Sequence, residues 1–155
     1  MTGPGSMTRD GAGADAFRAR LQGTFHGILH WHQLDALWER IRNGRWFLYQ
    51  VGEAPPETPL TGDALGARID ALDALLRRDH DHDYCGIVYV DDVEDPTLVK
   101  IYDPDNLGSS CSRSATPTPP RWLLSTALPA PVESDVPAPR SRRTWWQRLI
   151  RASGR

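Results

Sequence analysis

Apolar side chains recur at helical spacing in two stretches of this sequence. In residues 29–44 (LHWHQLDALWERIRNG) they fall at positions i, i+3, i+4 and i+7, which places one apolar stripe along an amphipathic helix. Asn43 and Gly44 are expected to end this helix, because both residue types tolerate the left-handed backbone conformation. Residues 62–78 (GDALGARIDALDALLRR) repeat the pattern, with Thr61 as the expected N-cap. The stripes consist of Leu34, Leu37, Trp38 and Ile41 in the first helix and Leu65, Ile69, Leu72, Leu75 and Leu76 in the second.

Three further stretches carry the β-branched and aromatic residues that are typical of strands. They are residues 45–51 (RWFLYQV), 84–90 (YCGIVYV) and 97–103 (TLVKIYD). The last two flank the turn sequence DDVEDP at residues 91–96, so they are expected to form a hairpin. The order helix, strand, helix, strand, strand predicts an α+β domain over residues 22–104, in which two helices pack on a mainly antiparallel three-stranded sheet.

The chain on both sides of this domain has a different character. Residues 1–21 are rich in Gly, Ala and Asp and are expected to be disordered. Residues 105–128 are expected to form an irregular loop and then a short apolar segment, RWLLSTAL, which packs back on the domain as an extended strand. Residues 129–141 have the composition of a Pro-rich linker, and residues 142–155 that of a basic amphipathic helix.

Charge is distributed unevenly along the 155 residues. The net charge of −2 conceals two opposite blocks: residues 79–105 contain nine acids and one base, and residues 136–155 contain six arginines and no acid. Blocks of opposite sign indicate interaction surfaces rather than a particular fold.

Cysteine content and hydropathy indicate in which cellular compartment the protein is expected. Cys85 and Cys111 are too few for a disulfide scaffold. The N-terminal residues lack the basic and apolar regions of a secretory signal, and no apolar run approaches the roughly 18 residues that cross a bilayer. The sequence therefore predicts a cytoplasmic protein with reduced thiols, and peripheral attachment to the inner face of the membrane is the alternative.

The C-terminal peptide RTWWQRLIR is the first candidate site. Its apolar side chains lie at positions i, i+1, i+4 and i+5 among arginines, and tryptophan and arginine are the residue types most enriched at binding hot spots. A helix this short is marginal in water, so another surface must stabilise it. That surface is expected to be a protein partner or an anionic membrane, and the alternative is the chain's own domain. The expected contact residues are Trp145, Trp146, Leu149 and Ile150 as apolar anchors, with Arg142, Arg143, Arg148 and Arg151 around them.

The DHDHD segment is the second candidate site. Imidazole and carboxylate groups alternate here, and they are ligand types for zinc, iron or nickel. The spacing matches no closed zinc motif, and the glycine and later glutamate of a calcium loop are missing. A solvated loop without metal, and hence no cofactor, is the main expectation. The residues of the possible metal site are Asp79, His80, Asp81, His82 and Asp83.

Two further chemistries receive less support. The Gly/Ser-rich loop around Cys111 (residues 106–114) has the residue types for a thiolate nucleophile, which would need a nearby base such as His80 or His82. Nucleic acid is an unfavourable partner, because the acidic turn at residues 91–96 would repel phosphate.

These patterns favour a non-catalytic accessory or adaptor protein. The acidic α+β domain and the tethered Trp/Arg-rich helix would each bind a surface, so that binding of one keeps the other within reach. The alternative from another class is a small metal-binding protein, or an enzyme that depends on a metal or a cysteine, which uses the DHDHD segment and Cys111.

Overall fold

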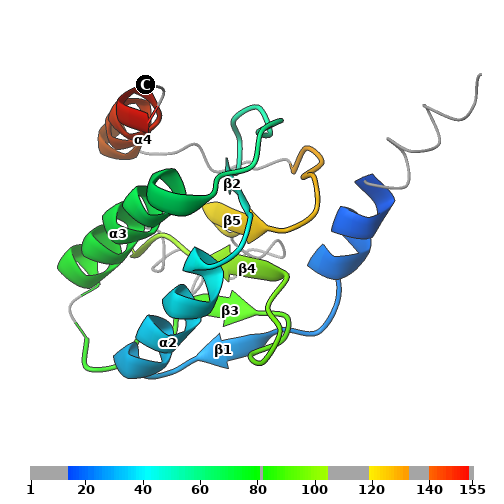
Figure 1. Ribbon diagram of the computed structural model, residues 1–155. Helices are drawn as coiled ribbons and strands as arrows, with labels where there is room; N and C mark the ends of the chain where they lie inside the picture. Colours follow the sequence, from blue (N-terminus) through cyan, green and yellow to red (C-terminus); the bar gives the residue numbers. More distant parts are fainter. Residues whose placement is uncertain (1–13, 81, 105–118, 133–139, 154–155) are drawn as a thin grey trace, which may run out of the picture.

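A five-stranded antiparallel sheet forms the centre of the protein (Figure 1). The computed structural model describes residues 14–80, 82–104, 119–132 and 140–153. The strands lie side by side in the order β1-β3-β4-β5-β2, and each neighbouring pair is antiparallel. Their bounds are β1 (His26–Ile28), β2 (Phe47–Gln50), β3 (Val88–Val90), β4 (Leu98–Ile101) and β5 (Trp122–Ser125).

Helices accompany both faces of this sheet. The labelled helices are α2 (Trp31–Arg42), α3 (Gly62–Asp79) and α4 (Arg140–Ser153), and residues 14–21 are also helical. The stripes predicted for α2 and α3 are buried against one face. On the other face, Phe17 from the helix at 14–21 is fully buried against Tyr49 and Leu123. The segment predicted to be disordered therefore includes an ordered helix, while residues 1–13 lie outside the described part of the chain.

Alternation along the strands explains why both faces are covered. In β5, Trp122 and Leu124 belong to the core beneath α2 and α3, whereas Leu123 belongs to the smaller core on the opposite face. In β2, Leu48 and Tyr49 divide in the same way. Successive side chains of a strand point to opposite faces, so strands that are apolar at consecutive positions must be buried on both sides.

The α+β class is confirmed, but the prediction of a three-stranded sheet is wrong. The chain adds β1 at one edge and inserts β5 between β4 and β2. Residues 121–128 do return to the domain as a strand, which is formed by Trp122–Ser125. Asn43 is the C-cap of α2 as expected, although its backbone stays right-handed with φ of −84°. No helix within the described residues is long and apolar enough to span a bilayer.

Candidate functional site

The apolar side of α4 packs against the protein's own domain. Trp146 is only 7% exposed and joins the main core, and the ring of Trp145 lies 5.6 Å from that of Trp122 in an edge-to-face arrangement. Leu149 and Ile150 are partly buried against the same core. Figure 1 shows the helix alongside α3. All four residues that the sequence suggested as anchors for a partner are thus used to dock the helix, which is the alternative that the sequence left open.

An ion pair fixes the first turn of α4. Arg142 is 2% exposed, and its Nε and Nη2 atoms donate to the two carboxylate oxygens of Asp103 at 2.9 and 3.0 Å. Asp79, the last residue of α3, forms a second ion pair with Arg142, in which Asp79 Oδ2 lies 2.7 Å from Arg142 Nη2. Arg142 thus connects α4 to the residues that follow β4 and to the end of α3. A buried guanidinium is tolerated because two carboxylates surround it.

The electrostatics of Asp79 make the stability of the protein sensitive to acid. Its hydrogen bond with Arg78 is the main cause that lowers its pKa from 3.8 to about 2, with a further contribution from Arg142. Because the folded pKa is lower than the unfolded one, this carboxylate stabilises the protein well above pH 3.8, and the stabilisation is lost as the pH falls toward 2.

Asp79→Asn should therefore remove a pH-dependent part of the stability. We expect urea unfolding at pH 7 to show a loss of about 2 kcal/mol in the free energy of unfolding, and the gap to the native protein should close as the pH approaches 2. Asp83→Asn is the control, because Asp83 is an exposed carboxylate of the same segment. A gap between Asp79→Asn and the native protein that stays constant with pH would contradict the assignment.

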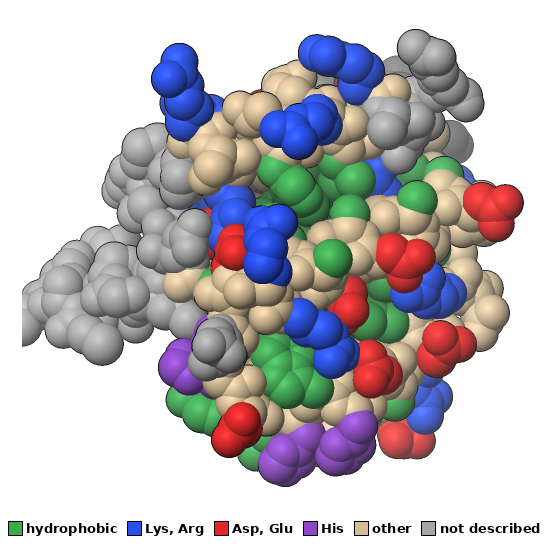
Figure 2. All heavy atoms as spheres, turned by 90° about the vertical axis from the view of Figure 1, so that its left-hand side faces the viewer, with side chains coloured by type: hydrophobic (Ala, Val, Ile, Leu, Met, Phe, Trp, Pro, Cys, Tyr) green, Lys and Arg blue, Asp and Glu red, His purple; other side chains and the backbone are tan. Residues whose placement is uncertain are grey.

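The outward side of α4 is cationic. Arg140, Arg143, Arg148 and Arg151 are exposed, and their positions repeat at close to helical spacing along one side of the helix. The helix contains no acid to neutralise them. Figure 2 shows basic side chains standing out from the surface at the top of the view, where α4 lies. These four arginines are called the cationic face of α4.

His80 and His82 follow the C-terminal end of α3, directly after Asp79, but they do not converge on a metal site. His80 is 5% exposed, and its Nε2 lies 2.7 Å from the carbonyl oxygen of Cys85. His82 is exposed and stacks on Tyr84, with the two ring centroids 5.6 Å apart. Burial is the main cause that lowers the pKa of His80, which favours its neutral form.

Metal binding by the DHDHD segment receives no support from this arrangement. The part of the chain that the structure describes contains no group of three or more His, Cys, Asp or Glu side chains placed to hold a metal ion. Asp79 is paired with Arg78 and Arg142, and Asp83 is exposed. Asp81 lies outside the described residues.

The two cysteines fall into different parts of the chain. Cys85 is fully buried, and this burial raises the pKa of its thiol, so it behaves as an unreactive core residue. The loop at residues 106–114, with Cys111, lies outside the described residues.

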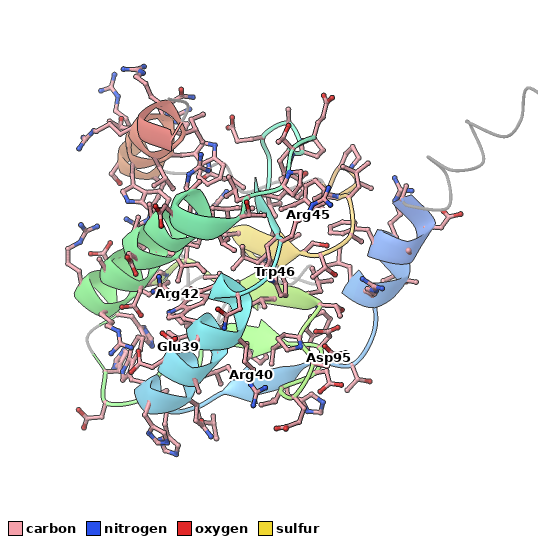
Figure 3. The ribbon with its side chains drawn as sticks, in the orientation of Figure 1. Glu39, Arg40, Arg42, Arg45, Trp46 and Asp95 are labelled. Carbon is pink, nitrogen blue, oxygen red and sulfur yellow. The ribbon has the colours of Figure 1, made fainter. Side chains whose placement is uncertain are left out.

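Carboxylates of the β3–β4 turn have a structural role. Asp92 Oδ1 accepts hydrogen bonds from the backbone N–H groups of Glu94 and Asp95, at 2.9 and 3.2 Å. Arg40 of α2 donates to the carbonyl oxygen of Glu94, and Figure 3 shows Arg40 and Asp95 in this region. The side chains of Asp92, Glu94 and Asp95 remain exposed, so the turn also presents an acidic surface.

Comparisons with protein-family models, with curated proteins and with solved structures give no significant match.

Proposed function

We propose that this protein is a non-catalytic adaptor that binds an acidic surface of a protein partner through the cationic face of α4. One observation carries the proposal: the helix buries Trp146 and Arg142 in its own domain, partly buries Trp145, and leaves four arginines exposed, which are Arg140, Arg143, Arg148 and Arg151. Surface residues without a role in packing are the ones available for recognition. In this proposal the indoles hold the helix, and the arginines contact the partner.

Docking of α4 supports such a role on energetic grounds. A 14-residue helix is marginal in water when isolated. Because Trp146 and Arg142 already fix it to the domain, a partner would not have to fold the helix as it binds. Arginine also suits a carboxylate-rich partner, since its planar guanidinium donates two parallel hydrogen bonds to one carboxylate. Four such groups on one face would accelerate encounter with an acidic surface, and salt would weaken the effect.

The acidic β3–β4 turn would provide the second contact of the adaptor. Asp92, Glu94 and Asp95 are exposed there. A basic surface on a second partner would complement them. Two surfaces of opposite charge on one small domain allow it to join two partners without binding both at the same place.

The experiment compares two variants that lose the same number of charges. Arg143→Gln/Arg148→Gln/Arg151→Gln removes three arginines of the cationic face. Arg18→Gln/Arg20→Gln/Arg45→Gln removes three exposed arginines outside α4. In pull-downs from native extract at about 0.15 M salt, we expect the first variant to capture at least about tenfold less of the partner. The control should retain capture, and equal loss in both variants would overturn the proposal.

A flotation assay distinguishes a protein partner from a membrane. The native protein is mixed with vesicles of phosphatidylcholine, or of phosphatidylcholine with phosphatidylserine. We expect the same weak association with both. If the protein floats only with the phosphatidylserine vesicles, and the three α4 substitutions abolish flotation, the target of the cationic face is an anionic bilayer and the proposed protein partner is wrong.

A further inference from the structure

Lys100 lies in the middle of the sheet, on the face that α2 and α3 do not cover. It belongs to β4, the third strand in the order across the sheet (Figure 1). Its register partners are Tyr89 of β3 and Leu123 of β5. Leu123 belongs to the smaller core on this face, so Lys100 and Tyr89 point to the same side. Lys100 is also the only lysine in the sequence.

Three aromatic side chains surround this amine. Lys100 Nζ lies 3.9 Å from the centroid of the Phe25 ring, close enough for a cation–π interaction. Tyr102, two residues further along the chain, packs edge-to-face with Tyr89, and the two ring centroids lie 5.7 Å apart. Phe25, Tyr89 and Tyr102 are called the aromatic cluster, and each of them is partly exposed, as Lys100 is.

The surroundings of Lys100 favour its neutral, nucleophilic form. None of the ion pairs within the described residues includes Lys100. Burial lowers the pKa of its ammonium. Burial also raises the pKa of Tyr102, with a further contribution from Tyr89, so the Tyr102 phenol adds no negative charge at neutral pH. The neighbours Leu98 and Leu123 on this face are apolar. A desolvated lysine amine in such surroundings is a good nucleophile toward carbonyl carbon.

We propose that Lys100 is a modification site, at which its amine condenses with a small uncharged aromatic aldehyde to form a Schiff base. The lone pair of Nζ attacks the carbonyl carbon, and the carbonyl oxygen takes up a proton. The resulting carbinolamine loses its hydroxyl as water while the nitrogen lone pair forms the C=N bond. One aldehyde and one amine thus give one imine and one water, without an oxidant or reductant.

The aromatic cluster explains why an aromatic aldehyde fits this amine. A protonated Schiff base keeps a positive charge on Nζ, so the attraction to the Phe25 ring is retained, whereas acylation would remove the charge. Tyr89 and Tyr102 offer ring surface to a flat aromatic body. The site does not depend on the proposed adaptor function, because no residue of the cationic face takes part in it.

Benzaldehyde with cyanoborohydride is the probe that tests Lys100 in the full chain. Cyanoborohydride transfers hydride to the protonated imine and leaves a stable N-benzyl amine, which mass spectrometry locates by peptide. Arg45→Lys adds an exposed amine to the same molecule as an internal reference. At pH 7 we expect Lys100 to be labelled at least about tenfold faster than position 45. The pH profile should also give a lower apparent pKa for Lys100 than for position 45. Equal or slower labelling of Lys100, or an equal apparent pKa, would overturn the proposal.

Two comparisons test the role of the aromatic cluster. Propanal lacks the ring, so the ratio of labelling at Lys100 to labelling at position 45 should be at least about threefold higher with benzaldehyde. Phe25→Leu removes the ring that Lys100 faces and keeps an apolar side chain, so it should lower the benzaldehyde ratio by at least about threefold. Circular dichroism must show that this variant is folded, and if it is not, the comparison of the two aldehydes decides. Equal ratios for both aldehydes, or an unchanged ratio in folded Phe25→Leu, would contradict the assignment of an aromatic aldehyde to this cluster.

Discussion

Replacing Asp103 with alanine should release α4 from the domain. The side chain of Asp103 is 1% exposed. Its two carboxylate oxygens accept hydrogen bonds from Nε and Nη2 of Arg142. Without Asp103, the buried Arg142 guanidinium would lose the carboxylate that accepts from both its Nε and its Nη2. Removing one partner of a buried ion pair costs about 3–5 kcal/mol, which is enough to detach a short helix. We expect the amides of α4 to lose their protection from hydrogen exchange, while those of β4 and β5 keep theirs.

Asp70→Ala is the matched control for this substitution. Asp70 pairs with Arg42 at 2.5 Å, but its side chain is 69% exposed. Exposed ion pairs contribute about 0–1 kcal/mol, so Asp70→Ala should leave hydrogen exchange in α4 unchanged. A double variant, Arg142→Met with Asp103→Leu, should recover most of the docking, since apolar residues often replace a buried ion pair without loss. If Asp103→Ala affects α4 no more than Asp70→Ala does, the ion pair is not what holds the helix.

The same substitution connects docking with function. Asp103→Ala leaves every arginine of the cationic face in place and removes a carboxylate that holds the first turn of the helix. If the face acts because it is held rigidly, capture of the partner should fall with the loss of protection in α4. Undiminished capture by an undocked α4 would mean that the arginines bind as a flexible segment.

The spacing of apolar residues predicted α2 and α3 because each of these helices buries one continuous stripe of apolar side chains. Leu34, Leu37, Trp38 and Ile41 are all buried in α2, as their spacing requires. The strands with consecutive apolar residues were harder to place. In β5 all four residues are buried on one face or the other, so no alternation distinguishes Trp122–Ser125 from a generic apolar segment. Strand β1 has three residues, of which only Ile28 is buried, and this is too short for any period to appear.

The candidate site was predictable in its residue types and not in its contacts. Spacing identified the indoles and arginines of α4, but the partners of Arg142 are distant along the chain, and Asp103 is 39 residues away. Only the fold brings the end of β4, the end of α3 and the start of α4 together. The same limit applies to the DHDHD segment. Its sequence contains metal-ligand types, whereas in three dimensions His80 Nε2 lies against the Cys85 carbonyl oxygen.

Trp122→Ala should destabilise the whole domain more than any change confined to α4. Trp122 is fully buried in β5, between β4 and β2, and its Nε1 donates to Gln50 Oε1 at 3.0 Å. Truncation would open a cavity beneath α3, remove the ring that Trp145 contacts, and leave the Gln50 oxygen unsatisfied. Such changes cost about 3–5 kcal/mol for the cavity alone, against a total stability of about 5–15 kcal/mol for an ordinary domain.

Urea unfolding followed by far-UV circular dichroism measures this effect, and two variants bracket it. Trp122→Phe keeps an aromatic ring in the core and loses the hydrogen bond, so it should lie between Trp122→Ala and the native protein. Tyr84→Ala removes a side chain that is 56% exposed and should change the midpoint little. If Trp122→Ala released α4 but left the unfolding midpoint of the sheet unchanged, Trp122 would serve the helix alone. The sheet would then not depend on Trp122 in the strand that joins β2 to β4.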